Sequence, residues 1–127
     1  MGNNLSEAGQ AGSLQLHPPQ ILTFDSYAKW KAHLDASKET NKLMVLDFTA
    51  TWCGPCKYMD QVIQQYAAQF TGVEFIKIDA DSLLEVSREY EVQIMPTFVL
   101  IKRGRVMEKV TGAKQEELQK LIEKHSK

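Results

Sequence analysis

The segment LMVLDFTATWCGPCK, residues 43–57, joins a continuous apolar run to a pair of cysteines spaced three positions apart. Residues 43–48 are apolar except for Asp47, which is typical of a β-strand that is buried on both faces. After the cysteines, apolar residues recur with a helical period from Met59 to Phe70, which predicts an amphipathic helix of about four turns. The segment therefore predicts a buried strand that leads into a helix, with the cysteines directly between them.

The rest of the chain alternates strand and helix signals in the same way. Before this segment, the sequence predicts a short strand over residues 21–24 and a helix capped by Asp25 or Ser26, with Tyr27, Trp30 and Leu34 on its inner face. After it, the sequence predicts a strand over residues 73–78, a short helix opened by a capping box of Ser82 and Glu85, a hairpin of strands over residues 97–101 and 106–111, and a helix from about Gln115. The order β-α-β-α-β-α-β-β-α predicts an α/β fold, a mixed central β-sheet with helices on both faces and an antiparallel hairpin at one edge.

The composition of the chain excludes several classes of function. A chain of 127 residues suits one domain, and a net charge of −1 without a long run of one sign offers nothing to nucleic acid. No apolar run approaches the roughly 20 residues that a membrane-spanning helix needs. The first 20 residues lack the basic start and apolar core of a secretory signal, so we expect a reducing, cytoplasmic location. In such a compartment the only two cysteines serve redox chemistry, a metal, or no function.

The place of the cysteines in the chain favours redox chemistry. A thiol at a helix N-terminus faces unpaired backbone N–H groups and the positive end of the helix dipole, and both stabilise the thiolate. Pro55 fits the first helical turn, where its missing N–H breaks no hydrogen bond. We expect Cys53 to be the exposed nucleophile and Cys56 the buried thiol that resolves a mixed disulfide.

Two other interpretations of the pair are weaker. A structural zinc site would need two further ligands, and the available histidines, His17, His33 and His125, do not lie at ligand spacing from the cysteines. Two inert core thiols are disfavoured because glycine and proline between them are poor core material. The sequence therefore predicts no metal site.

The chain resembles the thioredoxin family, and in particular the plant h-type thioredoxins with a lengthened N-terminus. The resemblance covers about residues 21–125. It depends on Trp52-Cys53-Gly54-Pro55-Cys56-Lys57, on Asp47 six positions before Cys53, on Met95-Pro96-Thr97, and on Gly104 and Gly112. Tyr58 departs from the family, which often has an aliphatic residue there. The resemblance implies the thioredoxin fold for residues 21–127.

A carboxylate in a buried strand is unfavourable unless it has a function, so we expect Asp47 to have a raised pKa. The resemblance implies that Asp47 accepts the proton of Cys56, that Lys77 lies near this carboxyl, and that Gly54 and Pro55 help to tune the redox pair. It also implies a cis peptide bond between Met95 and Pro96. The substrate-contact surface that the resemblance implies consists of Trp52, Gly54, Pro55, Met95, Pro96, Gly112 and Ala113.

The function that follows is the reduction of disulfide bonds in target proteins by dithiol–disulfide exchange. The resemblance implies a monomer that binds no cofactor and is regenerated by a flavin thioredoxin reductase that uses NADPH. One alternative is a disulfide oxidant or isomerase of the same fold, which the Gly-Pro dipeptide and the missing secretory signal disfavour. The other alternative is a redox-controlled binding module that holds partners without turnover.

Residues 1–20 predict a flexible N-terminal extension, because they are polar, aperiodic and end in His17-Pro18-Pro19. The extension begins Met1-Gly2-Asn3-Asn4-Leu5-Ser6, which matches the N-myristoylation pattern with Gly2 as the acceptor. One myristoyl chain gives only marginal membrane binding, and the chain has neither a second acylatable cysteine nor a polybasic run. Any membrane association is therefore expected to be loose.

Overall fold

The computed structural model describes residues 20–127 and contains the elements that the sequence predicts, in the predicted order. The strands are β1 (Leu22–Thr23), β2 (Leu43–Thr49), β3 (Glu74–Asp79), β4 (Thr97–Lys102) and β5 (Arg105–Thr111). The helices are α1 (Tyr27–Ser37), α2 (Gly54–Gln69), α3 (Leu84–Glu89) and α4 (Gln115–His125). Ser26 caps α1 by accepting the backbone N–H of Lys29 at 3.1 Å, as predicted.

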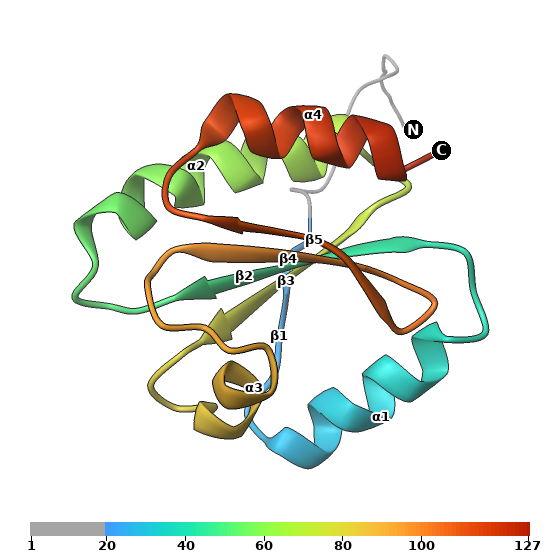
Figure 1. Ribbon diagram of the computed structural model, residues 1–127, viewed down its shortest axis with the longest axis horizontal. Helices are drawn as coiled ribbons and strands as arrows, with labels where there is room; N and C mark the ends of the chain where they lie inside the picture. Colours follow the sequence, from blue (N-terminus) through green and yellow to red (C-terminus); the bar gives the residue numbers. More distant parts are fainter. Residues whose placement is uncertain (1–19) are drawn as a thin grey trace, which may run out of the picture.

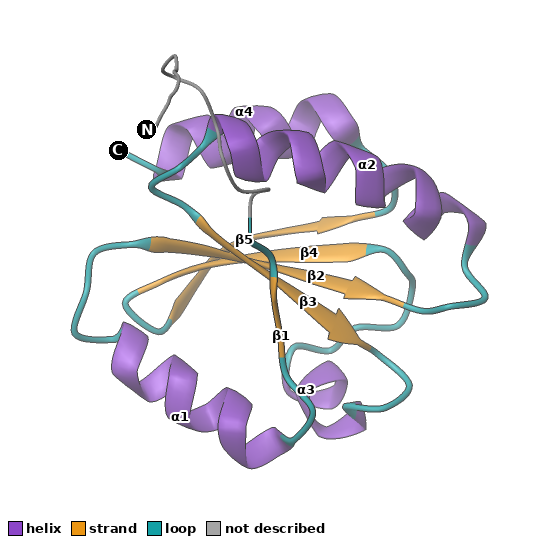
Figure 2. Ribbon diagram, turned by 180° about the vertical axis from the view of Figure 1, so that it is seen from behind, coloured by secondary structure: helices purple, strands orange, loops and turns teal. Residues whose placement is uncertain are grey.

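The strands form one five-stranded sheet in the order β1-β3-β2-β4-β5. β1, β3 and β2 are parallel, whereas β4 pairs antiparallel with β2 and β5 pairs antiparallel with β4. Helices α2 and α4 cover one face of the sheet, and α1 and α3 cover the other (Figures 1 and 2). The predicted mixed sheet with helices on both faces and an antiparallel edge hairpin is confirmed.

Two apolar clusters fill the space between the sheet and its two helical layers. Because side chains alternate along a strand, Val45 packs in the cluster under α2 and α4, while Leu46 packs in the cluster next to α1 and α3. Every residue of β2 is buried for this reason. Trp30, which the sequence assigns to the core, is fully buried in the second cluster.

Helix α2 begins at Gly54, directly after Cys53, which agrees with the prediction that Pro55 lies in its first turn. The start of one helix differs from its prediction. The predicted capping box of α3 is wrong: its N-cap is Leu83, with no side-chain hydrogen bond. The Oδ1 atom of Asp79 instead accepts the backbone N–H groups of Asp81 and Ser82, which closes the turn before α3 begins.

The hairpin between β4 and β5 turns at Arg103 and Gly104, which both have positive φ angles, 53° and 82°. Two successive positive φ angles are the backbone of the tight turn that matches the twist of paired strands. A Cβ atom on Gly104 would also lie 2.8 Å from the side chain of Lys38. This position therefore favours glycine for both conformation and space.

Gly104→Ala should lower the free energy of unfolding by about 1–2 kcal/mol, because alanine is strained at this φ angle and must displace Lys38. Gly72→Ala is the matched control, since no atom lies within 4 Å of its added Cβ and it is not among the glycines with positive φ. Denaturant unfolding of the two variants measures the difference. Equal stability of the two variants would contradict this account of the turn.

Candidate active site

The cysteines lie where the chain leaves β2 and enters α2. Cys53 is the N-cap residue of the helix, and its Sγ atom accepts the backbone N–H of Cys56 at 3.2 Å. The two residues form a disulfide bond, with their Cα atoms 5.3 Å apart. Pro55 occupies the first helical turn, as predicted. The sequence thus located the pair correctly at the N-terminus of a helix, where backbone N–H groups stabilise a thiolate.

The expectation that Cys53 is exposed is wrong for the disulfide-bonded protein. Cys53 is 4% exposed and Cys56 is 2% exposed. Both pack in a small cluster with Ala50, and the half-buried side chain of Met95 lies against it. Burial therefore does not distinguish the two cysteines. They differ in position, because Cys53 is the N-cap residue of α2 and Cys56 lies within the first turn of the helix.

Asp47 lies in the middle of β2 and is only 3% exposed. Burial disfavours the charged carboxylate and raises the pKa of Asp47 to about 7, from an ordinary value of 3.8. The negative charge of Asp60 adds to this rise in pKa, and the positive charge of Lys77 opposes it. The raised pKa that the sequence predicts for Asp47 is confirmed, and it suits a group that exchanges protons near neutral pH.

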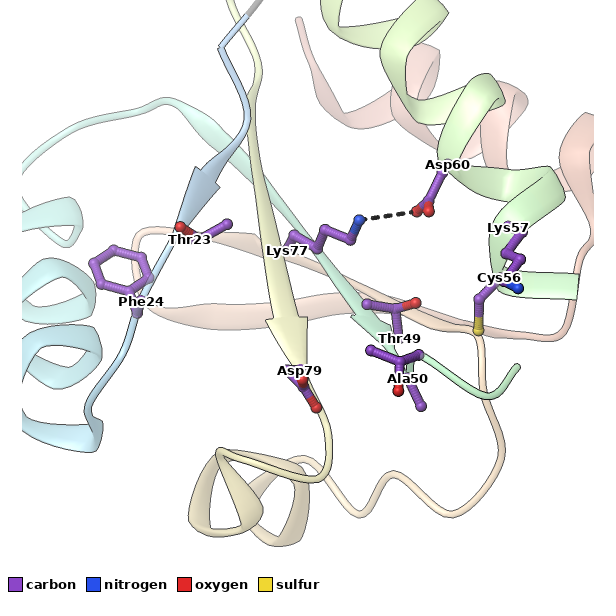
Figure 3. A pocket seen from close by; sticks show the side chains of 10 residues that line it. Thr23, Phe24, Thr49, Ala50, Cys56, Lys57, Asp60, Lys77 and Asp79 are labelled. Carbon is purple, nitrogen blue, oxygen red and sulfur yellow. Dashed lines mark ion pairs between the residues drawn. The ribbon is translucent and has the colours of Figure 1, made fainter. Parts of the chain in front are cut away.

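Lys77 lies beside Asp47 in the register of β2 and β3, close to the carboxyl as expected. Its ammonium group, however, pairs with Asp60, with Nζ and Oδ1 3.3 Å apart (Figure 3). Asp60 is not among the site residues predicted from the sequence. The available signal was its position four residues after Cys56, since residues at this spacing lie on the same side of a helix.

Two neighbouring cavities lie beside the disulfide and beside the buried carboxyl. A cavity of about 360 Å³ is lined by Cys56, Thr49 and Ala50 among others, and Figure 3 shows the Cys56 side chain at its edge. A second cavity of about 200 Å³ is lined by Asp47. Thr23, Asp60 and Lys77 line both cavities. Both spaces have polar groups in their walls, among them Asp60 and Lys77, and are large enough to hold water.

Exposed residues surround the cysteine pair. Trp52 is 67% exposed, which excludes a role in the core, and its indole Nε1 donates a hydrogen bond to Asp81 at 2.9 Å. Gly54 and Pro55 are exposed as well. Asp81 is not among the site residues predicted from the sequence. Nor is Ile94, which precedes Met95 and is 60% exposed.

The Met95–Pro96 peptide bond is cis, as the resemblance implied. The Pro96 carbonyl accepts the N–H of Gly112 at 2.8 Å, which joins this segment to Gly112 and the exposed Ala113. Met95 also packs against the cysteines. The predicted contact residues therefore come from three separate parts of the chain and meet around the disulfide.

No group of metal-binding side chains occurs among residues 20–127. His33 and His125 instead pair with Glu74 and Glu108, at 2.6 and 2.8 Å. Gly2 and His17 lie outside the described residues. In the part of the chain that the structure describes, no helix is long and apolar enough to cross a membrane.

Comparisons with known proteins agree with this geometry. The family model described as "Thioredoxin" matches residues 22–124. "Thioredoxin H2" of Arabidopsis thaliana is 44% identical over 118 residues, covering 93% of this chain and 89% of the relative. "Thioredoxin H2-1" of rice is 47% identical, covering 80% of this chain and 74% of the relative. A crystal structure of a thioredoxin from Nicotiana alata superposes with a TM-score of 0.84 at 48% identity, covering 90% of this chain and 99% of that one.

Replacing Asp47 by alanine should raise the free energy of unfolding of the oxidised protein by about 1–3 kcal/mol at pH 8. A folded pKa of about 7 lies above the ordinary value, so the contribution of Asp47 to stability is present below the unfolded pKa and is lost as pH rises through about 7. Alanine has no carboxyl to ionise, so the variant does not lose this stability above pH 7. The small cavity that the shorter side chain leaves offsets part of the gain in stability. Near pH 4 the Asp47→Ala variant should be no more stable than wild type.

Denaturant unfolding at pH 4 and pH 8 measures this difference. Asp25→Ala, which removes a carboxylate whose side chain is 78% exposed, is the matched control and should change stability little at either pH. An Asp47→Ala variant that is less stable than wild type at both pH values would show that the carboxylate stabilises the fold.

Proposed function

The chain belongs to the thioredoxin family, and from this premise we propose the role of each of its site residues in the reduction of a disulfide bond. It is a thiol–disulfide oxidoreductase that acts on disulfide-containing target proteins and is itself reduced by thioredoxin reductase. The observation that carries the proposal is the Cys53–Cys56 disulfide at the N-terminus of α2.

Cys53 is the nucleophile. In the reduced protein its thiolate attacks one sulfur of a target disulfide, which forms a mixed disulfide and releases the second target sulfur as a thiolate. Its N-cap position supports this role, because the Cys56 N–H points at Cys53 Sγ and the helix dipole favours negative charge there. Cys56 lies inside the helix, where its sulfur can reach Cys53.

Cys56 resolves the mixed disulfide. Its thiol gives its proton to Asp47, and the resulting thiolate attacks Cys53 Sγ, so that the Cys53–Cys56 bond forms and the bond between Cys53 and the target breaks. The target leaves with both of its sulfurs reduced to thiolates, which take protons from water. Two electrons pass from the cysteine pair to the target. The cavities beside Cys56 and Asp47 support proton transfer through water, and a pKa of about 7 lets Asp47 accept and release the proton near neutral pH. Gly54, Pro55 and Lys77 tune the pair through backbone shape and charge.

The target binds around the disulfide as an extended segment. The backbone of Met95, ahead of cis Pro96, offers it strand-like hydrogen bonds. The exposed Trp52 and Ala113 and the half-buried Gly112 offer apolar contact. Likeness to the h-type thioredoxins supports the rest of the proposal: a cytoplasmic monomer regenerated by an NADPH-dependent flavin reductase.

Trapping with insulin, whose chains are joined by disulfides, tests the division of roles. Cys56→Ser should accumulate a covalent adduct with an insulin chain through Cys53, because the resolving thiol is gone, while wild type with dithiothreitol reduces insulin and accumulates none. Cys53→Ser is the matched control and should trap little. Non-reducing electrophoresis measures the adduct.

Two outcomes would contradict the proposal. Equal trapping by Cys53→Ser would overturn the assignment of nucleophile and resolving thiol. Wild-type protein that leaves insulin disulfides intact would instead support a binding module without turnover.

Residues 1–20 form an extension to the thioredoxin domain of residues 21–127, and Gly2 is N-myristoylated. The sequence Met1-Gly2-Asn3-Asn4-Leu5-Ser6 supports this modification. A single acyl chain without a polybasic run gives weak, reversible membrane attachment.

Co-expression with an N-myristoyltransferase should add one myristoyl group to wild type and none to Gly2→Ala, as measured by mass spectrometry of the intact protein. Asn3→Ala, which keeps the acceptor glycine, is the control and should still be modified. An unmodified wild-type chain would contradict the assignment of Gly2. Modified protein should sediment only partly with lipid vesicles, and complete retention would contradict weak attachment.

A further inference from the structure

Three charged side chains meet between the sheet and α2. Asp47 and Lys77 are register partners on β2 and β3, and they lie two residues after Val45 and Phe75, whose side chains pack in the cluster under α2. Asp47 and Lys77 therefore face α2, which carries Asp60. Although Lys77 has Asp47 as its neighbour on the adjacent strand, its ammonium group forms its ion pair with Asp60, at 3.3 Å (Figure 3).

We propose that Asp60 is a positioning residue for the resolving step: by binding Lys77, it keeps the ammonium group from neutralising Asp47. This inference deepens the proposed function, and it rests on the role of Asp47 as the proton acceptor of Cys56. Asp60 does not exchange the proton itself.

The geometry supports this role in two ways. Asp60 and Lys77 line both the cavity beside Cys56 and the cavity beside Asp47, so the ion pair lies where the two cavities adjoin. The pair is also partly open to water, since both side chains are 39% exposed, whereas Asp47 is buried. Lys77 thus has a more solvated partner in Asp60, where an ion pair carries a smaller desolvation penalty.

The electrostatic effects of the two residues on Asp47 have opposite signs. The Asp60 carboxylate raises the pKa of Asp47, and the Lys77 ammonium lowers it. Loss of the Asp60 charge would remove the repulsion and would also free Lys77 to approach Asp47, so both changes lower the pKa of Asp47. A carboxyl with a lower pKa is a weaker base toward a thiol.

The other groups around Asp47 do not supply a comparable charge. β4 places Phe98 opposite Asp47, and β1 contributes Thr23 to the same cavity. Two further charged residues, Lys57 of α2 and Asp79 at the end of β3, line the cavity beside Cys56 but not the cavity beside Asp47. Asp60 and Lys77 are therefore the charged pair that both cavities share.

The test compares pH profiles. The midpoint of Asp47 ionisation is followed by the carbon-13 NMR shift of its carboxyl group, and the resolving step by single-turnover reduction of a disulfide peptide. In Asp60→Asn, the midpoint of Asp47 ionisation and the midpoint of the pH profile of the resolving rate should both move to lower pH by about one unit. The resolving rate at pH 8 should fall several-fold.

Asp60→Glu is the matched control, because it keeps the negative charge and should leave both midpoints within about 0.3 units of wild type. Lys77→Gln removes the opposing charge and should move both midpoints to higher pH. In an Asp47→Asn background, Asp60→Asn should no longer shift the rate profile. Asp60 and Lys77 are partly exposed, so these substitutions leave the core intact.

Several results would overturn the inference. One is an Asp60→Asn variant in which the midpoint of Asp47 ionisation does not change. Another is an Asp60→Glu variant in which this midpoint moves as far as in Asp60→Asn. The third is a Lys77→Gln variant in which the midpoint moves to lower pH. If Asp47→Asn remains slow in resolution while Asp60→Asn behaves as wild type, this inference fails and the proposed function stands. If Asp47→Asn keeps the wild-type rate profile, the proposed role of Asp47 fails and the inference fails with it.

Discussion

Strand β2 is shielded from solvent along its whole length, because it is the middle strand of the sheet and helices cover both faces. This burial determines where the chemistry takes place. The strand ends next to the N-terminus of α2, so the disulfide lies at the rim of the core rather than inside it. The same burial removes the Asp47 carboxyl from water, which gives it a pKa unlike that of a surface aspartate.

A buried carboxyl responds strongly to nearby charges because little water screens it. Asp60 and Lys77 form a partly exposed ion pair near this carboxyl, and their charges change the pKa of Asp47 in opposite directions. The pair also borders both the cavity lined by Cys56 and the cavity lined by Asp47. The disulfide and the carboxyl with the raised pKa therefore border neighbouring cavities between β2, β3 and α2.

The agreement between sequence and structure is uneven along the chain. The order of elements was predictable because each carries a strong local pattern, such as the apolar run of β2 or the helical period that continues through Tyr66. The capping box before α3 failed although its residues are present at the right spacing. Asp79, at the end of β3, satisfies the backbone N–H groups of the turn first, and a local motif cannot reveal that competing acceptor.

The sequence by itself determined the order of strands and helices, the place of the Cys53–Cys56 pair at a helix N-terminus and the presence of a carboxyl in a buried strand, because these depend on residues close together in the chain. Only the tertiary structure decided that Cys53 is covered in the disulfide form and that Lys77 pairs with Asp60. The second outcome depends on the distance between a strand and a helix. That distance is set by how side chains far apart in the sequence pack together, and no local pattern records it.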